Sequence, residues 1–540
     1  MARVLVADPI DELGVARLKA AGHHVDVRKG LSEDELCAMV GDYEAMVVRS
    51  ETKVTERIIE HATRMVGIGR AGVGVDNIDV DAATQHGIAV VNSPTGNTIA
   101  AAEHAFALMI SLARNIPQAD ASMRRSEWTR SRFMGVELRG KTLGIIGLGR
   151  VGSEVAHRAR AFQMHVIAYD PYVSMERVRS LGVESVPMER LLRESDFISI
   201  HTPLTSGTKS LIGEPEFALL KPGVRIVNAA RGGLVDERLL QEGLASGKIG
   251  GAALDVFPVE PPQDLPLREE NRVVLTPHLG ASTEEAQVEV ALEVVEQLNA
   301  ILGGGAAQYT INMPFVPQEV MEALGPYLPV ATAMGRLAIQ LADGQLETVA
   351  VRVAGDIAHH DIEILASAAL VGVLSVATDM RINLVNAQAM AQERGIRIVE
   401  EKDPEGGEQY LNLVGVEVRS TGGTVYTAGT SVHGAVHLNR LNDFTLDMEP
   451  SAPYMLFTTH TDQPGMIGKV GTIAGEHDAN ISFMEVGRAA PRGAATMIVG
   501  FDDPVTDAML RDIKAIDGMT TARLVTYEAS EPVQPRLRGT

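Results

Sequence analysis

Three residues that can move protons or hold a carboxylate each follow a separate strand-like run: Arg231, Glu260 and His278. The carboxyl ends of parallel strands meet at one edge of an open sheet, so these side chains are expected to converge on a ligand crevice. An imidazole takes up a proton near neutral pH, and a carboxylate on its other nitrogen fixes the tautomer. A guanidinium can hold a substrate carboxylate with two parallel hydrogen bonds. The set predicts proton removal from the hydroxyl of a 2-hydroxy acid as a hydride leaves its carbon.

Each residue taken alone has a structural explanation. His278 follows Pro277 and could be an ordinary loop residue, Glu260 lies in a proline-rich loop and could be a solvated charge, and Arg231 could pair with Asp236. Their joint occurrence after three strands, behind a nucleotide-binding motif, favours the functional interpretation.

That motif lies between Lys141 and Asp170, where the chain predicts a strand, a glycine turn, a helix, a second strand and an acid. Gly147, Gly149 and Gly152 form a GxGxxG pattern, in which the glycines permit a tight turn, approach of a pyrophosphate and close helix packing. The Asp170 carboxylate can bind an adenosine ribose and would repel a 2′-phosphate, which predicts NAD rather than NADP as cofactor. A glycine turn in an unrelated α/β protein is the alternative.

Composition narrows the class of protein. The 540 residues predict three or four domains, and 45% hydrophobic with 22% charged residues is typical of a globular protein. Cys37 is the one cysteine, so no disulfide can form within the chain, and a reducing, cytoplasmic location is expected. No apolar run reaches the length of a membrane helix, and the N-terminus enters a strand pattern directly, without a signal peptide.

Charge bears on the partners. The net charge of −22 argues against nucleic-acid binding, and no metal site is predicted. An anionic substrate would need a local group of arginines or lysines to overcome this field.

Alternating strand-like and helical runs predict an α/β fold with two doubly wound, Rossmann-like parallel sheets. The nucleotide domain, residues 98–280, is expected to be inserted into a substrate domain formed by residues 1–97 and 281–316. The pattern changes after residue 317. Residues 317–452 predict an α+β intervening domain with a helix over Ile382–Arg394, residues 453–528 predict a ferredoxin-like βαββαβ domain, and residues 529–540 predict a disordered tail.

Residues 1–316 resemble the D-isomer-specific 2-hydroxyacid dehydrogenases through five motifs, GIIGLGRVG, HTPLT, NAARGGLVDE, GAALDVFPVEPP and TPHLGAST. The resemblance implies that Arg231 binds substrate, that Glu260 and His278 form the acid–base pair, and that Asp255 contacts the nicotinamide end. With the fingerprint residues, the predicted cofactor site comprises Gly147, Gly149, Arg150, Val151, Gly152, Asp170, His201, Thr202, Pro203, Ala229, Ala230, Asp255 and Gly280.

The residues after 316 indicate which group of these dehydrogenases the chain resembles. Residues 453–528 resemble an ACT domain, and INLVNAQAMAQERGI resembles the intervening domain of long-form D-3-phosphoglycerate dehydrogenases. This family implies D-3-phosphoglycerate as substrate, whose carboxylate and phosphate need more than one arginine. The predicted substrate-binding residues are Arg49, Ser50, Arg70, Gly72, Val73, Asn97 and Arg130. Arg130 lies in a basic segment that is either a solvated helix end or part of a dimer interface reaching a neighbouring active site.

The ACT resemblance also implies regulation. Asp462 and Asn480 could bind the amino and carboxylate groups of L-serine across an ACT–ACT interface, which predicts feedback inhibition and a homo-oligomer, either dimer or tetramer. The spacing of Gly465, Gly468 and Gly471 would let a neighbouring backbone come close. A purely structural turn is the alternative.

Two other functions stay open at this point. One is a dehydrogenase for another D-2-hydroxy acid, such as 2-hydroxyglutarate. The other is an NAD(H)-sensing interaction protein that needs no turnover, against which the Arg231, Glu260 and His278 set argues.

Overall fold

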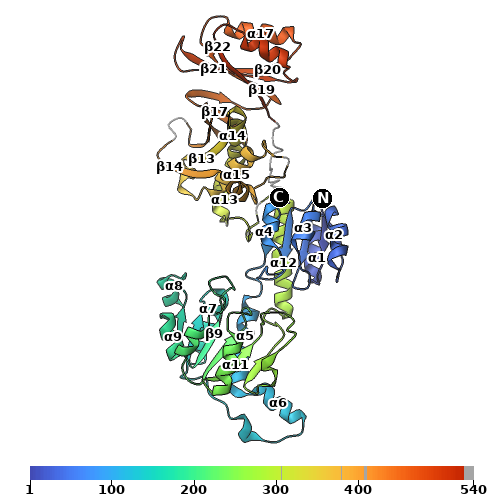
Figure 1. Cartoon of the computed structure of the whole chain (residues 1–540), viewed down its shortest axis with the longest axis vertical. Helices are drawn as coiled ribbons and strands as arrows, with labels where there is room; N and C mark the ends of the chain where they lie inside the picture. The colour runs from blue at the N-terminus through green and yellow to red at the C-terminus, as the bar shows by residue number, and fades with distance from the viewer. Residues whose placement is uncertain (306, 315, 379, 407–409, 528–540) are drawn as a thin grey trace.

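The computed structural model describes residues 1–527 except 306, 315, 379 and 407–409, so the predicted tail at 529–540 lies outside the described residues. Four sheet-based bodies form an elongated molecule, with the two parallel sheets in one half and the two C-terminal sheets in the other (Figure 1). Within the described part of the chain, no helix combines the length and apolar character needed to cross a membrane.

The first sheet has five parallel strands in the order β2-β1-β3-β4-β5. Its strands are β1 (Arg3–Val6), β2 (His24–Val27), β3 (Ala45–Val48), β4 (Gly67–Arg70) and β5 (Ala89–Asn92). The helices between them are α1 (Glu12–Ala20), α2 (Glu33–Met39), α3 (Glu56–His61) and α4 (Val80–Gln85). The central strands are buried on both faces, as expected for a parallel sheet covered by helices.

The second sheet has seven parallel strands in the order β12-β11-β10-β9-β6-β7-β8. Its strands are β6 (Thr142–Ile146), β7 (His165–Tyr169), β8 (Glu184–Ser185), β9 (Phe197–Ile200), β10 (Val224–Asn228), β11 (Ile249–Leu254) and β12 (Val273–Leu275). The helices are α7 (Arg150–Ala161), α8 (Met175–Ser180), α9 (Met188–Glu194), α10 (Glu214–Leu219) and α11 (Glu237–Ser246). The strand order reverses between β6 and β9, which is where ligands bind in open α/β sheets.

Two long helices connect these bodies, α5 (Thr98–Arg114) and α12 (Glu284–Leu302). The chain leaves the first body through α5 and returns through α12, which runs from one body to the other (Figure 1). Val294 and Leu298 of α12 pack so closely on β4 that a side chain at Gly69 would overlap them. The first body therefore includes α12, although α12 follows the whole second body in sequence.

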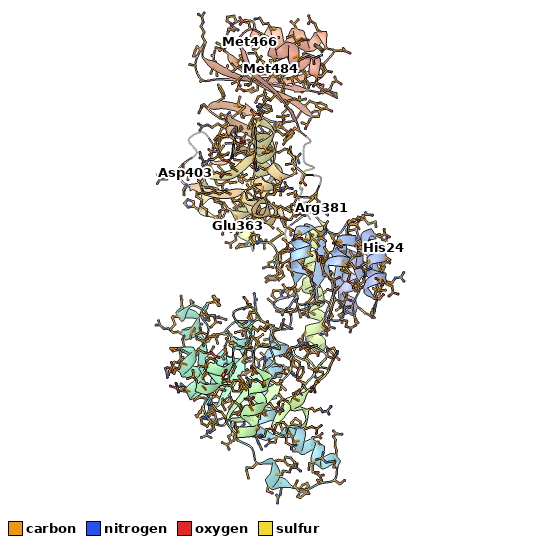
Figure 2. The ribbon with its side chains drawn as sticks, in the orientation of Figure 1. His24, Glu363, Arg381, Asp403, Met466 and Met484 are labelled. Atoms are coloured by element: carbon orange, nitrogen blue, oxygen red, sulfur yellow. The ribbon has the colours of Figure 1, made fainter. Side chains whose placement is uncertain are left out.

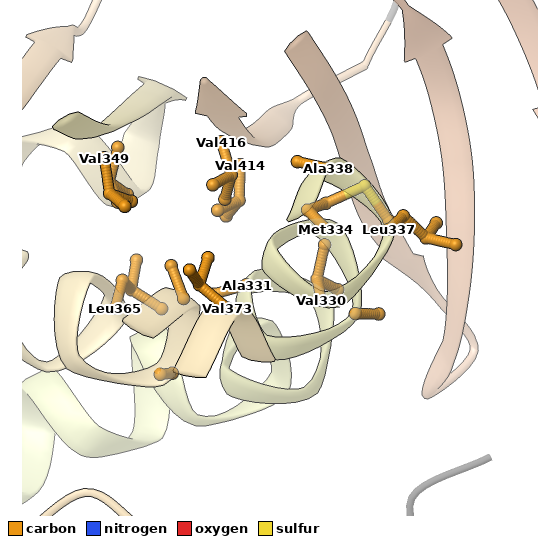
Figure 3. Close-up of a cluster of buried hydrophobic side chains, with 14 of the residues drawn as sticks. Val330, Ala331, Met334, Leu337, Ala338, Val349, Leu365, Val373, Val414 and Val416 are labelled. Atoms are coloured by element: carbon orange, nitrogen blue, oxygen red, sulfur yellow. The ribbon is translucent and has the colours of Figure 1, made fainter. Parts of the chain in front are cut away.

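The intervening body is a six-stranded mixed sheet, ordered β14-β13-β15-β16-β17-β18, in which only β13 and β14 run parallel. The strands are β13 (Leu346–Gly355), β14 (Arg397–Asp403), β15 (Asn412–Ser420), β16 (Gly423–Val432), β17 (Ala435–Leu441) and β18 (Phe444–Met448), with helices α13 (Gln318–Leu324), α14 (Leu328–Leu341), α15 (Glu363–Leu374) and α16 (Ala387–Glu393). Val349 and Val416 on the sheet face Leu365 and Met334 on the helices (Figure 3).

The helix predicted over Ile382–Arg394 begins only at Ala387. The asparagines before it bond to backbone instead: the Asn383 amide N–H donates to the Asn386 side chain at 2.8 Å, and the Asn383 side chain donates to the Gly87 carbonyl at 2.7 Å. Such side-chain bonds compete with helix formation. They also attach this segment to the first body, where Arg381 lies at the junction (Figure 2).

The C-terminal body is antiparallel, in the order β20-β21-β19-β22. It consists of β19 (Tyr454–Thr461), α17 (Met466–Glu476), β20 (Ile481–Arg488), β21 (Ala494–Phe501), α18 (Asp507–Lys514) and β22 (Met519–Thr526), which is the predicted βαββαβ order. One sheet face packs on α17 and α18, while Met455 and Phe457 belong to the same hydrophobic core as the intervening body.

The predicted fold class is confirmed: two parallel Rossmann-like sheets, a mixed intervening sheet and an antiparallel ACT-type sheet. The domain boundaries stay a prediction.

Candidate active site

The loops that carry the predicted catalytic residues begin at the same edge of the second sheet. Asn228 of β10 is paired in register with Leu254 of β11, and Leu254 with Leu275 of β12, so three loops leave the sheet at the same edge. Glu260 follows β11 and His278 follows β12. Their side chains meet, with His278 Nδ1 2.6 Å from Glu260 Oε2.

The Glu260 carboxylate is held on both oxygens. Its Oε1 accepts the Phe257 amide N–H at 2.9 Å, while Oε2 faces the imidazole. Burial by itself would raise the pKa of Glu260, but the bonds from His278 and Phe257 outweigh it, so the pKa lies below its ordinary value. Both side chains keep a third or more of their surface exposed, 44% for His278 and 34% for Glu260. A charged carboxylate therefore fixes Nδ1 of an imidazole that solvent or substrate can still reach.

Arg231 crosses to the first body. Its Nε lies 3.2 Å from Asp76 Oδ2, and its Nη1 donates to the Ala230 carbonyl at 2.7 Å. A side chain at Gly74 would overlap the guanidinium, so the loop after β4 lies directly on Arg231. Asp236, the partner considered in the structural alternative, instead caps α11 by accepting the Leu239 amide N–H at 3.0 Å. Arg231 thus lies between the two bodies.

Arg70, at the end of β4, completes a group of arginines. Burial lowers its pKa to about 10, and the positive charges of Arg231 and Arg49 act in the same direction. Its Nε is buried without a hydrogen-bond partner among the described residues. Three cations from different strand ends, one with an unpaired buried donor, form the local positive field that an anionic substrate requires in a chain of net charge −22.

Two side chains that sequence reasoning missed hold these substrate loops. Asp8 is 1% exposed and accepts the Arg49 and Thr52 amide N–H groups at 2.6 and 3.1 Å. Asn92 donates to the Val73 carbonyl at 2.5 Å, beside Gly72. An acid directly after the first strand, in VLVAD, was the available signal for Asp8.

The glycine turn fits a dinucleotide. A side chain at Gly147 would overlap the His201 carbonyl, and one at Gly152 would overlap the Gly147 carbonyl, whereas Gly149 has no heavy atom within 4 Å of that position. The Asp170 carboxylate accepts the Leu148 amide N–H at 2.7 Å, which fixes it beside the turn. Space at the second glycine, with an acid fixed beside it, suits a pyrophosphate and a ribose.

The HTP segment lines the same switch point. Thr202 Oγ1 is buried and has no hydrogen-bond partner among the described residues. His201 bonds to Ser199 at 2.8 Å, and burial lowers its pKa to about 4, so the ring is neutral at physiological pH. An unpaired hydroxyl beside the glycine turn is a free group for a cofactor.

Asp255 has a different environment from the one expected of a nicotinamide contact. It is fully buried, and both of its oxygens accept bonds from within the chain, including the Leu279 and Gly280 amide N–H groups at 2.8 and 3.0 Å. Its bonding therefore organises the loop that carries His278.

The other predicted site residues are placed as follows. Arg150 and Val151 begin α7. Pro203 follows β9, and Ala229 and Ala230 follow β10. Asn97 is the N-cap residue of α5. Ser50 follows β3 next to Arg49. Arg130 lies in a short 3-10 turn, Arg130–Phe133, after α6 (Ile116–Arg124); it is exposed, and no contact among the described residues joins it to the crevice. Nor do those residues include a group of three His, Cys, Asp or Glu placed to bind a metal ion.

The predicted regulatory residues lie in the C-terminal body. Asp462 accepts the Arg492 amide N–H at 2.9 Å, and Arg488 lies 3.7 Å away. The Asn480 side chain donates to Asp502 at 2.5 Å. Asp462 follows Thr461, which pairs with Ala494 at the start of β21, whereas Asn480 precedes Ile481, which pairs with Phe501 at the end of β21. Within one chain the two residues therefore lie at opposite ends of this strand.

Comparison with known proteins finds three family domains along the chain. Residues 106–280 match the NAD-binding domain of the D-isomer-specific 2-hydroxyacid dehydrogenases, residues 323–439 the D-3-phosphoglycerate dehydrogenase intervening domain, and residues 454–518 the ACT domain. A D-3-phosphoglycerate dehydrogenase from Synechocystis sp. is 46% identical over 527 residues, covering 97% of this chain and 95% of its own.

The chain belongs to the D-3-phosphoglycerate dehydrogenases. Further members are similar over nearly their whole length: the Archaeoglobus fulgidus protein is 44% identical over 97% of this chain and 99% of its own, and the Bacillus subtilis protein 41% over 97% and 99%. The predicted family and NAD-binding domain are thereby confirmed.

Solved structures of relatives match the two parallel bodies of this D-3-phosphoglycerate dehydrogenase. The TT0316 protein from Thermus thermophilus aligns with a TM-score of 0.53 and 33% identity, over 57% of this chain and 99% of its own. A D-lactate dehydrogenase from Aquifex aeolicus, solved with NAD and lactic acid, aligns with a TM-score of 0.50 and 29% identity, over 56% and 96%.

Proposed function

We propose that this chain catalyses the NAD-dependent oxidation of D-3-phosphoglycerate to 3-phosphohydroxypyruvate, the entry to serine synthesis. The observation that carries the proposal is the 2.6 Å contact between His278 and Glu260 at the sheet edge from which Arg231 extends toward Arg70 and Arg49. An acid–base pair and a cationic group on one crevice are the two requirements of an anionic 2-hydroxy acid.

His278 is assigned the role of general base. Glu260 holds Nδ1, so Nε2 is the nitrogen available to take the hydroxyl proton from C2 of the substrate. The imidazolium that forms is stabilised by the Glu260 carboxylate, and it returns the proton in the reverse reaction. When bound, NAD supplies the nicotinamide ring that accepts the hydride from C2.

Arg231 is assigned to the substrate carboxylate. The substrate carboxylate would replace Asp76 as the partner of Arg231. Because the Asp76 side chain is 67% exposed, breaking this ion pair costs little free energy. Arg70 and Arg49 are left for the remaining negative charge, with Ser50, Gly72, Val73 and Asn97 on the surrounding loops. Arg130 would bind phosphate only from a neighbouring subunit.

The C-terminal body is assigned to regulation. An ACT domain suggests an amino-acid effector, and we assign L-serine, bound by Asp462 and Asn480 at an interface between two chains of a homo-oligomer. The open glycine positions on α17, at which a side chain would meet no heavy atom within 4 Å, support an interface there.

The test is NAD reduction by the purified chain with D-3-phosphoglycerate, paired with NADH oxidation by 3-phosphohydroxypyruvate, each with and without L-serine. Turnover that serine suppresses is the expected result. Turnover indifferent to serine would remove the effector assignment and keep the reaction. Turnover of 2-hydroxyglutarate with none of phosphoglycerate would contradict the substrate assignment.

A further inference from the structure

A second imidazole–carboxylate pair lies behind the first. His104, on α5, places Nε2 3.0 Å from Asp255 Oδ1. Whereas His278 and Glu260 are substantially exposed, the His104 side chain is 19% exposed and Asp255 is fully buried. A carboxylate can only accept a hydrogen bond, so Nε2 of His104 carries the hydrogen that this contact requires.

Asp255 is the point at which the His278 loop is fixed. Its Oδ1 also accepts the Thr276 hydroxyl at 2.5 Å and the Leu279 amide N–H at 2.8 Å, and its Oδ2 accepts the Gly280 amide N–H at 3.0 Å. Its main-chain carbonyl accepts the amide N–H of His278 at 2.8 Å. Thr276, His278, Leu279 and Gly280 are thus each bonded to one buried acid.

The loop needs this support because His278 has a φ of 55°, in the left-handed region. A residue other than glycine is strained in such a conformation, which persists only where its surroundings determine it. The conformation directs the ring toward Glu260. Loosening the Asp255 bonds would let the backbone relax and would move the ring away from its 2.6 Å contact.

We infer that His104 is a positioning residue for proton transfer: its Nε2–H orients the Asp255 carboxylate, which in turn holds the His278 loop in its left-handed conformation. The role in proton transfer rests on the proposed function, whereas the role in holding the loop does not. His104 lies two turns into α5, the helix through which the chain leaves the first body, so the support of the base comes from a helix that connects the two bodies.

The test compares His104→Gln, whose amide can donate from nearly the same place, with His104→Leu, which cannot donate. The control is His157→Leu on α7, an exposed histidine of the same body. Steady-state kinetics with D-3-phosphoglycerate are measured together with NADH affinity and hydrogen–deuterium exchange of the peptide covering residues 276–282.

His104→Leu is expected to lower kcat by about 10- to 100-fold, as for a misplaced catalytic group, with KM and NADH affinity within about threefold of wild type. Exchange over residues 276–282 should accelerate. His104→Gln should recover most of the kcat and protection, and His157→Leu should match wild type.

An unchanged kcat and exchange rate in His104→Leu would overturn the inference. So would a Gln variant as impaired as the Leu variant, or a loss of kcat matched by an equal loss of NADH affinity. If wild type does not turn over phosphoglycerate, the proposed function fails, while the exchange measurement still decides the role of His104.

Discussion

Two glycine-rich turns lead from a strand into a helix in this molecule, and their glycines have different surroundings. In the turn between β6 and α7, a side chain at Gly147 or Gly152 would overlap the chain's own backbone, and only Gly149 is open. In the turn into α17 and along that helix, no heavy atom of the described chain beyond the adjacent residues and the helix's own backbone lies within 4 Å of the side-chain position at four glycines: Gly465, Gly468, Gly471 and Gly475.

Glycine therefore occupies the two turns for different physical reasons. At the first turn, two glycines serve the folding of this chain and one leaves room for a ligand. On α17, Gly468, Gly471 and Gly475 each destabilise the helix by about 0.5–1 kcal/mol relative to alanine, and no other element among the described residues packs against their side-chain positions. The same face of α17 carries Ile467, whose side chain is 55% exposed. This helix lies in the C-terminal body at one end of the molecule, where Met466 and Met484 are labelled (Figure 2).

The largest effect is expected from Gly152→Val. The new side chain would overlap the Gly147 carbonyl, so the start of α7 must shift. We expect overpacking to lower the unfolding free energy by about 1–3 kcal/mol and NADH affinity to fall by roughly 100-fold. Thermal denaturation and NADH fluorescence titration measure the two effects. Normal NADH affinity would show that the first turn is as open as the second.

A smaller and more selective effect is expected from Gly149→Ala. Because this position is open within the chain, the unfolding free energy should stay within about 0.5 kcal/mol of wild type. NADH affinity should fall by about 10-fold, since the methyl group occupies space predicted for the pyrophosphate. A variant that loses stability as Gly152→Val does would remove the distinction between the two positions.

Asp170→Ala tests whether the acid beside the first turn selects the cofactor. The carboxylate is fixed by the Leu148 amide, and removing it should weaken NADH binding by about five- to tenfold, which corresponds to a net hydrogen-bond contribution of about 1–1.4 kcal/mol. NADPH affinity should rise, because the charge that repels the 2′-phosphate is gone. An unchanged ratio of the two affinities would place the ribose elsewhere.

The smallest effect on turnover is expected from Gly468→Ala. Because no other described part of the chain lies within 4 Å of this side-chain position, the variant should keep kcat and KM and gain up to about 0.5–1 kcal/mol of helix stability. Serine inhibition should weaken by several-fold, because the methyl group faces the proposed interface. Retained inhibition and an unchanged oligomeric state would mean that nothing approaches this face.

The first turn could be predicted from sequence because its signal is local: a strand, three glycines and an acid within 30 residues of each other in the chain. The Glu260–His278 pair followed from the same logic of adjacent strand ends. The partners of Arg231 and Asp255 could not be predicted. Asp76 and His104 are ordinary residues of a loop and a helix, and only the placement of α5 and the β4 loop brings them to the crevice.

The C-terminal half shows the limit of periodicity. Ile382–Arg394 has the hydrophobic spacing of a helix, but Asn383 and Asn386 bond to backbone and delay the helix to Ala387. Here side-chain hydrogen bonding and docking on Gly87 override the pattern.

The hydrophobic core shared by the intervening and C-terminal sheets has a consequence for how the molecule melts. Met455, Phe457, Ile498 and Val525 of the ACT-type sheet belong to one cluster with Met334 and Leu337 of α14, whereas each parallel sheet packs around clusters of its own. We therefore expect the C-terminal half to unfold as one cooperative unit in calorimetry. A ligand that binds only the native state of the ACT-type sheet should raise the melting temperature of both C-terminal sheets together. By mass action alone, it should therefore also stabilise the intervening body, which contacts the first body.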